Sequence, residues 1–273
     1  MATHADVLAR YRAFLVDVDG VLTRGNEALP GAAAGLAALR QRGRTLVLTN
    51  NSTRSRDELA RHLRDLGFGV GPDDVVGSAF LAARYLTMHC GPSAVWVLGE
   101  EGIRGEMAAA GHRVAEDPRE AAWVVVGMDR HLTYEKLSHA LEALVRGARV
   151  LATNEDATFP TAAGLVPGAG ALVGALRGMG YPPDVVVGKP SPVGFEVALD
   201  VCGVQPEGAL MIGDRLETDV AGANAAGIDS ALVLTGVCTD EDARKSETRP
   251  RWLAASLAEL SAGRAVALPG PLQ

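Results

Sequence analysis

The chain has 273 residues, enough for one large domain or two smaller ones, and its 48% hydrophobic and 22% charged residues are typical of a globular protein. A formal net charge of −7 argues against nucleic acid or an anionic membrane surface as a partner, so an anionic substrate must be attracted by local cations. No apolar run approaches the roughly 20 residues of a membrane span, and no secretory signal is expected from the first residues.

Residues 1–90 alternate between short apolar runs and helix-forming segments joined by short links. This alternation predicts right-handed crossovers and a parallel sheet. Pro30-Gly31 opens a helix that Gly43 ends, and Ser52 or Thr53 is expected to cap the next helix. The expected strands cover residues 13–16, 45–48 and 73–76, and the expected helices cover residues 30–42, 53–66 and 78–88.

The pattern restarts at residue 94 and changes back near residue 184, which predicts a smaller α/β domain over residues 91–183. Its expected strands cover 95–98, 123–126 and 149–152, and its helices 101–110, 133–145 and 169–179. The core, residues 1–90 and 184–273, resumes with strands at 184–187, 209–212 and 231–234, a helix that ends at 201, and helices at 218–226 and 252–260. The predicted fold class is α/β: a doubly wound parallel-sheet core with an inserted smaller α/β cap domain.

Polar side chains stand just past several predicted core strands, where ligands of open α/β sheets collect. An isolated Asp-x-Asp at a strand end is about as often a pair of solvated carboxylates as it is part of a functional site. The prediction of a site therefore rests on the combination of several such residues. One topology places the whole set at one edge of one sheet. Its members are Asp17, Asp19, Thr49, Asn50, Lys189, Asp214 and Asp219.

The residue types in this set favour phosphoryl transfer with a divalent metal. Clustered carboxylates repel one another unless a cation neutralises them, and hard oxygen ligands suit Mg²⁺. The charge on a transferring phosphoryl group could be neutralised by Mg²⁺, Lys189, Thr49 and backbone N–H groups. A carboxylate nucleophile splits hydrolysis into two easier steps, and a second carboxyl group can protonate the leaving alkoxide and later activate water.

Four segments in this order resemble the motifs of the haloacid dehalogenase (HAD) superfamily. The spacing resembles the subclass with a large α/β cap, because about 30 residues separate the first two motifs and about 140 separate Thr49 from Lys189. The chain is most similar to the NagD-like phosphatases, which include p-nitrophenyl, phosphoglycolate, glycerol-phosphate and pyridoxal-phosphate phosphatases. The segments are Asp17-Val18-Asp19-Gly20-Val21, Thr49-Asn50-Asn51-Ser52, Gly188-Lys189-Pro190 and Gly213-Asp214-Arg215-Leu216-Glu217-Thr218-Asp219.

The resemblance implies a role for each matching residue. Asp17 would be the nucleophile and Asp19 the general acid and base. Thr49 would bind the phosphoryl group with the N–H of Asn50 beside it, and Lys189 would neutralise nucleophile and phosphate. An aspartate two residues after the nucleophile favours a phosphatase over a dehalogenase, which has no alkoxide to protonate.

The resemblance also implies a Mg²⁺ site. Asp214 would complete the metal shell with the Asp17 carboxylate and the Asp19 carbonyl oxygen, and Asp219 would act mainly by orienting these ligands. Gly20 and Asn51 join Asn50 as expected substrate-binding residues of the core.

The predicted cap carries a polar loop directly after one of its strands, over residues 153–160. Asn154 and Asp156 in this loop are the candidate substrate-binding residues of the cap. The alternative is a stable turn held by Asn and Asp side chains. The position of Glu155 is often proline in relatives, so the shape of this loop is a point that the sequence leaves open.

Other possible sites receive less support from the sequence. There is no P-loop, and the histidines lack metal-ligand spacing. Cys90, Cys202 and Cys238 are too few and too far apart for a disulfide framework, which predicts buried thiols and a reducing, cytoplasmic setting.

The predicted function is a Mg²⁺-dependent phosphatase that hydrolyses a small phosphorylated metabolite through a phosphoaspartate. Sugar phosphates, glycerol phosphate and phosphoglycolate are candidate substrates, p-nitrophenyl phosphate is an artificial one, and a homodimer is expected by analogy alone. The alternatives are a phosphomutase, a catalytically idle phosphate-binding protein and a signalling receiver module. A receiver has no need of a large insertion and carries its phosphoacceptor at the end of the third strand, whereas Asp73-Asp74 stands at the start of a strand here instead of ending one.

Overall fold

The computed structural model describes residues 7–161 and 164–268. The chain forms two compact units. The first unit contains residues 1–48, 60–75 and 189–273, and the second contains residues 49–59 and 76–188. The segment Thr49–Leu59 therefore belongs to the second unit, although it begins at the last residue of a strand in the sheet of the first.

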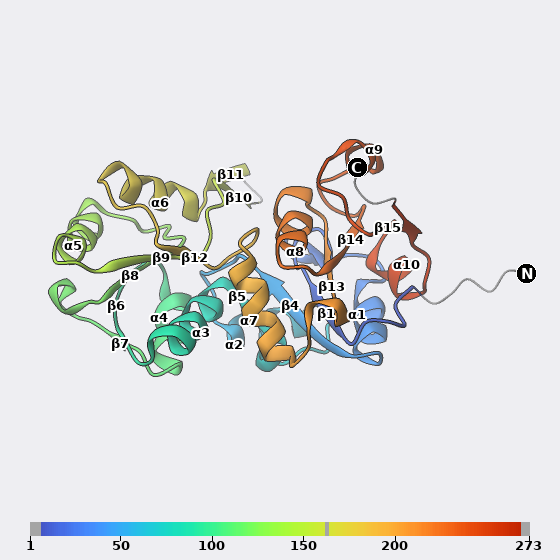
Figure 1. The fold of residues 1–273 in the computed structure, drawn as a ribbon, viewed down its shortest axis with the longest axis horizontal. Coiled ribbons are helices and arrows are strands. Elements are labelled where there is room, and N and C mark those ends of the chain that lie inside the picture. Colours follow the sequence, from blue (N-terminus) through green and yellow to red (C-terminus); the bar gives the residue numbers. More distant parts are fainter. Residues whose placement is uncertain (1–6, 162–163, 269–273) are drawn as a thin grey trace, which may run out of the picture. The chain divides into compact units, whose positions relative to one another are not determined.

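The first unit is built on a seven-stranded sheet in the order β16-β15-β14-β13-β1-β4-β5 (Figure 1). β1 pairs in parallel with both β13 and β4, and all four of its residues are buried, as expected for an inner strand of a covered parallel sheet. Among the described pairings of this seven-stranded sheet, only the edge strand β16 is antiparallel to its neighbour. The strands are β1 (Ala13–Val16), β4 (Arg44–Thr49), β5 (Val75–Gly77), β13 (Ala209–Gly213), β14 (Asp229–Val233), β15 (Trp252–Ala254) and β16 (Val266–Ala267).

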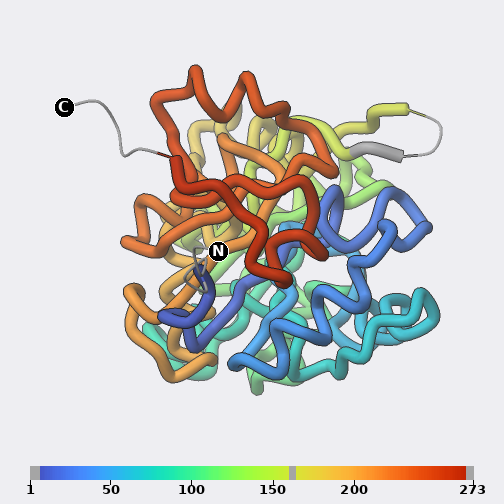
Figure 2. Tube along the Cα trace, turned by 90° about the vertical axis from the view of Figure 1, so that its right-hand side faces the viewer, coloured from blue at the N-terminus to red at the C-terminus, as the bar shows by residue number. Residues whose placement is uncertain are grey.

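Helices and turns connect these strands. α1 and α10, blue and red in Figures 1 and 2, lie side by side, and a Cβ added at Gly35 would lie 3.1 Å from Leu257. A small hairpin follows β1. The α-helices are α1 (Ala32–Arg40), α2 (Arg56–Asp65), α7 (Pro192–Cys202), α8 (Ala221–Ala225), α9 (Asp240–Lys245) and α10 (Leu257–Ser261). Between them lie the 3₁₀ helices η1 (Pro72–Asp74) and η3 (Pro206–Gly208), the π-helix η4 (Leu216–Val220) and the hairpin of β2 (Thr23–Arg24) and β3 (Glu27–Ala28).

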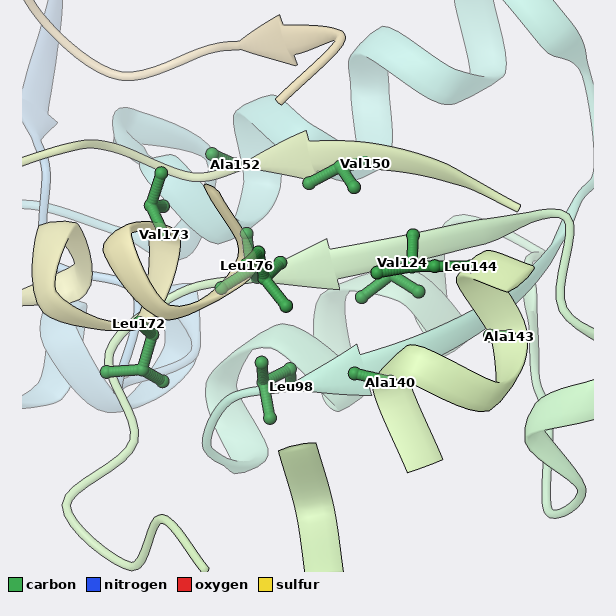
Figure 3. Close-up of a cluster of buried hydrophobic side chains, with 11 residues drawn as sticks. Leu98, Val124, Ala140, Ala143, Leu144, Val150, Ala152, Leu172, Val173 and Leu176 are labelled. Atoms are coloured by element: carbon green, nitrogen blue, oxygen red, sulfur yellow. The ribbon is translucent and has the colours of Figure 1, made fainter. Parts of the chain in front are cut away.

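The second unit contains a five-stranded parallel sheet in the order β12-β9-β8-β6-β7. Side chains of α5 and α6 pack on one face of it, where Leu144 and Leu176 meet Val124 and Val150 (Figure 3). Its elements are α3 (Ser78–Cys90), β6 (Ala94–Leu98), α4 (Glu101–Ala109), β7 (Arg113–Val114), η2 (Pro118–Glu120), β8 (Trp123–Val126), α5 (Tyr134–Val145), β9 (Arg149–Ala152), β10 (Thr158–Thr161), β11 (Gly164–Pro167), α6 (Ala169–Gly178) and β12 (Val185–Val186).

The predicted α/β class with parallel sheets is confirmed, but several local expectations are wrong. The strand expected at 184–187 is β12, and it pairs with β9 of the five-stranded sheet through Val185 and Leu151 rather than with the core sheet. The helix expected over 252–260 starts at Leu257, because residues 252–254 form β15 beside β14. The expected limits of the inserted domain, 91–183, stay a prediction.

The third error concerns the start of α2. Ser55, not Ser52 or Thr53, caps this helix: the N–H of Glu58 donates to Ser55 Oγ at 3.3 Å, and the N–H of Ser55 donates to Glu58 Oε2 at 2.9 Å. Ser52 is instead buried, and its Oγ accepts the N–H of Met128. Ser52 therefore makes a tertiary hydrogen bond to Met128 instead of capping α2.

The three cysteines form no disulfide, and their exposure differs from the expected burial. Cys238 is buried, Cys202 is half-buried and Cys90 is exposed at the end of α3. Among the helices of the described residues, none has the length and apolar character needed to cross a membrane.

Candidate active site

A buried ion pair lies at the carboxyl end of β1. The backbone N–H of Asp17 donates to Ile212 O at 2.9 Å and so extends the pairing of β1 with β13 by one residue. Lys189 Nζ donates to Asp17 Oδ1 at 2.6 Å. Burying two charges is costly unless the remaining hydrogen-bonding capacity is satisfied, and Lys189 also donates to Asp219 Oδ1 at 2.6 Å and to Leu48 O at 3.5 Å.

Asp219 connects this ammonium group to the loop after β13. Its Oδ2 accepts the backbone N–H groups of Asp214 at 3.2 Å and Arg215 at 3.1 Å. The short π-helix η4 brings the carboxylate back over Gly213, where an added Cβ would lie 2.3 Å from Asp219. Both oxygens of Asp219 therefore already accept N–H groups, and this residue holds Lys189 and the Asp214 loop in place.

Asp214 is held at one oxygen only. Its Oδ2 accepts the N–H of Val237 at 2.9 Å, whereas its Oδ1 is buried with no hydrogen-bond partner among the described residues. The carboxylate is enclosed by Gly20, whose φ is 82°, and by Gly236, where an added Cβ would lie 1.9 Å from Asp214 Oδ2. Sequence reasoning missed Gly236 and Val237, and the only signal was a glycine shortly after a predicted strand.

The electrostatics of this cluster follow from its burial. Desolvation raises the pKa of Asp17 to about 8, with the charges of Asp219 and Asp214 adding to the rise and Lys189 opposing it. Desolvation and the Asp219 charge likewise raise the pKa of Asp214 to about 6. Burial alone would lower the pKa of Lys189, but the Asp17 and Asp219 carboxylates raise it above its ordinary value, so the lysine stays charged. One lysine does not balance three carboxylates, which leaves a deficit of positive charge.

A divalent cation fits that deficit. Asp17, Asp214 and Asp219 are all buried, and each offers a carboxylate oxygen within 4.8 Å of the others. Asp214 Oδ1, which is buried without a hydrogen-bond partner among the described residues, is available to ligate a cation, and a set of hard oxygen donors suits Mg²⁺. Because Asp219 is engaged at both oxygens, Asp17 and Asp214 are the better ligands of the three.

The loop that follows β4 is shaped by its own side chains. Thr49 ends β4 and is buried, and its Oγ1 accepts the N–H of Asn51 at 3.2 Å. A hydroxyl that accepts one hydrogen bond can still donate its own hydrogen. Asn51 Oδ1 accepts the N–H of Thr53 at 2.9 Å and its hydroxyl at 2.8 Å, which closes a turn of the Asx type.

Asn50 lies in a second cluster, within the second unit. Its Nδ2 donates to Asp156 Oδ2 at 2.8 Å, and Asn154 Nδ2 donates to the same oxygen at 2.6 Å. The three predicted residues Asn50, Asn154 and Asp156 are thus brought together, although Asn50 lies more than a hundred positions before the other two in the chain.

Comparison with known proteins identifies the family. Residues 14–113 match the family described as haloacid dehalogenase-like hydrolase, and residues 186–260 match the one described as HAD-hydrolase-like. The chain belongs to the haloacid dehalogenase superfamily. Within this HAD superfamily it falls in the NagD-like class, as its resemblance in sequence suggested.

Individual relatives agree with this class. The sugar-phosphatase AraL of Bacillus subtilis is 37% identical to this HAD protein over 238 residues, 86% of this chain and 87% of the relative. The p-nitrophenyl phosphatase from Archaeoglobus fulgidus is 36% identical with a TM-score of 0.87, over 92% of this chain and 98% of that one. Glycerol phosphate phosphatase from Mycobacterium tuberculosis, in complex with magnesium, is 38% identical with a TM-score of 0.85, over 94% and 78%. The chain is accordingly a phosphoric monoester hydrolase of the HAD type.

The predicted HAD residues fall into two groups in the structure. Asp17, Lys189, Asp214 and Asp219 form one cluster in the first unit, with Gly20 against Asp214. Asp19 is exposed at the turn after β1, where its backbone bridges to Thr23. Thr49, Asn50 and Asn51 lie in the segment that belongs to the second unit, together with Asn154 and Asp156.

Proposed function

We propose that this HAD phosphatase is Mg²⁺-dependent and hydrolyses a small phosphorylated metabolite through a phosphoaspartate at Asp17. The observation that carries the proposal is the buried Asp17 carboxylate, held at 2.6 Å by Lys189 beside a second carboxylate whose Oδ1 has no partner among the described residues. Magnesium in the structure of the Mycobacterium tuberculosis relative supports the choice of metal.

In the first half of the reaction, the free lone pair of an Asp17 oxygen attacks phosphorus and forms an acyl phosphate, while the bond from phosphorus to the ester oxygen breaks. Lys189 neutralises Asp17 and the transferring group, and Asp219 keeps the ammonium in place. Asp19, exposed beside the Gly20 turn, gives its proton to the leaving alkoxide.

In the second half, Asp19 takes a proton from water, the hydroxide attacks the phosphorus of phosphoaspartate, and the bond to Asp17 breaks with release of inorganic phosphate. Asp17 and Asp214 carboxylates with the Asp19 carbonyl oxygen would hold Mg²⁺. When bound, the metal supplies positive charge against the phosphoryl oxygens. Thr49 Oγ1 and the N–H of Asn50 bind those oxygens, as do the backbone groups of Gly20 and Asn51.

We propose that the inserted residues 91–183 set the choice of ester. The relatives act on a sugar phosphate, glycerol phosphate or p-nitrophenyl phosphate, which indicates a small organic phosphate as the substrate class. That Asn154 and Asp156 touch the substrate stays a prediction, and in the structure Asp156 Oδ2 accepts the side-chain amides of both Asn154 and Asn50.

The test is hydrolysis of p-nitrophenyl phosphate and of a panel of phosphorylated metabolites, read as free phosphate. We expect turnover with Mg²⁺ and none with EDTA. Release of free phosphate separates a phosphatase from a phosphomutase, which returns the phosphoryl group to its substrate. A label from a phosphodonor that persists for minutes without turnover would instead support a receiver-type module.

The covalent step is tested with Asp17→Asn, which should abolish turnover because an amide is a poor nucleophile. Removal of a nucleophile costs more than about 10⁴-fold in kcat. The matched control is Asp65→Asn, an exposed aspartate at the end of α2. Retained activity in Asp17→Asn with a folded protein would exclude the phosphoaspartate mechanism.

A further inference from the structure

Asn50 is fixed at three of its atoms. Its side-chain Nδ2 donates to Asp156 Oδ2 at 2.8 Å, and its backbone oxygen accepts the fully buried hydroxyl of Ser78 at 2.7 Å. Its Oδ1 packs on Gly188, where an added Cβ would lie 2.8 Å away. Asn50 therefore has no freedom to rotate its amide without losing the bond to Asp156.

Asp156 is itself held from two directions. Its Oδ2 accepts Asn154 Nδ2 at 2.6 Å, and the Oδ1 of Asn154 accepts the hydroxyl of Thr153 at 2.9 Å, in a buried row of side chains at the end of β9. Its backbone oxygen accepts the N–H of Gly170 at 3.0 Å, at the start of α6. Glycine is also required at position 168, because an added Cβ at Gly168 would lie 2.2 Å from the backbone oxygen of Asp156.

The neighbouring carboxylate has a different environment. Glu155 is exposed and pairs with Arg177, also exposed, at 2.5 Å. Glu155 and Asp156 are adjacent and carry the same charge, but only Asp156 reaches the loop after β4. Substitutions at these two positions therefore separate the effect of removing a negative charge from the effect of removing the hydrogen bond to Asn50.

We infer that Asp156 is a positioning residue: it holds Asn50 through the side-chain amide and so fixes the phosphate-binding loop that begins at Thr49. The inference rests on the proposed function, and it replaces the expected substrate contact of Asp156 and Asn154 with an action through Asn50. A carboxylate in direct contact with a phosphate dianion would be repelled, whereas Oδ2 here is neutralised in part by two amide N–H donors. Preorganised donors of this kind cost no reorganisation when the anion binds.

The test compares Asp156→Ala, Asp156→Asn and the control Glu155→Gln. Loss of a hydrogen bond to a charged group is worth roughly a tenfold change in affinity. In Asp156→Ala we expect KM for p-nitrophenyl phosphate and the inhibition constant of inorganic phosphate to rise together by about tenfold, with kcat changed by less than about threefold. Asp156→Asn keeps an oxygen acceptor and should restore most of the affinity, and Glu155→Gln should match the wild type.

A second readout is amide hydrogen exchange in residues 49–53, which should accelerate in Asp156→Ala and not in Glu155→Gln. Unchanged KM, phosphate inhibition and exchange in Asp156→Ala would overturn the inference. So would a rise in KM with an unchanged phosphate inhibition constant, because that pattern marks a contact with the leaving group. A wild-type protein that releases no phosphate would overturn the proposed function, while exchange in residues 49–53 would still decide whether Asp156 holds Asn50. If Asp156→Ala does not fold, Asn50→Ala, which removes the amide that donates to Asp156, is measured against Glu155→Gln instead, and an unchanged phosphate inhibition constant and unchanged exchange would overturn the inference.

Discussion

The two polar clusters of this molecule differ in how their hydrogen-bonding capacity is met. In the first unit, three buried carboxylates surround the single ammonium of Lys189, and Asp214 keeps a buried oxygen without a partner among the described residues. In the second unit, a single carboxylate, Asp156, receives two amide donors. An ionic cluster that its own residues cannot neutralise is prepared for a cation and an anionic substrate. A cluster whose hydrogen-bonding groups pair with one another is rigid, and a rigid cluster can hold a neighbouring loop in place.

After loss of the nucleophile itself, the largest effect should come from removing the ammonium group of Lys189 from the first cluster. Lys189→Met leaves the buried carboxylates Asp17 and Asp219 without their shared donor. We expect kcat for p-nitrophenyl phosphate to fall by about 10²–10³-fold and the free energy of unfolding to fall by about 3 kcal/mol. Steady-state kinetics and urea denaturation measure the two losses.

The control is Lys245→Met, whose exposed ammonium pairs with Glu241 on α9. It should leave both quantities within error of the wild type. A Lys189→Met protein with normal turnover would show that the first cluster does not depend on the positive charge of Lys189.

A smaller effect is expected where the backbone, rather than a charge, shapes the first cluster. Gly236→Ala places a methyl group against Asp214, whose Oδ2 would lie 1.9 Å from the new Cβ. Displacement of a metal ligand or its support typically weakens metal binding by about 10–100-fold. We expect the Mg²⁺ concentration for half-maximal activity to rise by this factor, with the same change in Mg²⁺ binding measured by calorimetry.

Gly174→Ala in α6 is the matched control, since an added Cβ there meets nothing within 4 Å. It should leave metal binding unchanged and can stabilise the helix slightly. Equal Mg²⁺ dependence in the two variants would contradict the tight enclosure of Asp214.

The smallest effect is expected at Asp74, a buried acid that is fully paired, in contrast to Asp214 of the first cluster. Asp74 is buried like Asp17, and burial alone would raise its pKa, but the N–H of Gly71 and the guanidinium groups of Arg40 and Arg44 hold the pKa below its ordinary value. Because its folded pKa is lowered, the ionised carboxylate stabilises the fold above the unfolded pKa of about 4, and this stabilisation is lost as the pH falls through the lower folded pKa.

Asp74→Asn should therefore reduce the free energy of unfolding by about 1–2 kcal/mol at pH 7. The gap between variant and wild type should shrink as the pH is lowered below about 4, which denaturation at a series of pH values measures. A gap that stays constant down to pH 3 would mean that the ionised form of Asp74 has no special role.

Local patterns in the sequence determined much of this fold. The expected strands at 13–16, 123–126 and 149–152 match β1, β8 and β9, and Thr133 caps α5 as expected, since its Oγ1 accepts the N–H of Lys136. Apolar runs of four residues and capping side chains are short-range signals that depend on neighbours along the chain. The positions of the acids after β1 and β13 followed from the same signals.

Tertiary structure decided the elements whose partners lie far away in the chain. The run Trp252-Leu253-Ala254 pairs with β14 as a strand, although periodicity alone does not distinguish a short strand from the start of a helix. The strand Val185–Val186 joins β9 because its register partners are Leu151 and Ala152, and no local feature of the two valines selects one sheet over another.

For the site, the sequence by itself determined which residue types carry the chemistry: the acids, the lysine and the threonine stand after strands in a recognisable order. Only the folded chain decided how they are supported. The enclosure of Asp214 by Gly20 and Gly236, the bond from Asn50 to Asp156 and the membership of Thr49–Leu59 in the second unit all join residues distant in sequence. Such contacts form only when the whole core packs, because their stabilisation must exceed the entropy lost in closing the long loops between them.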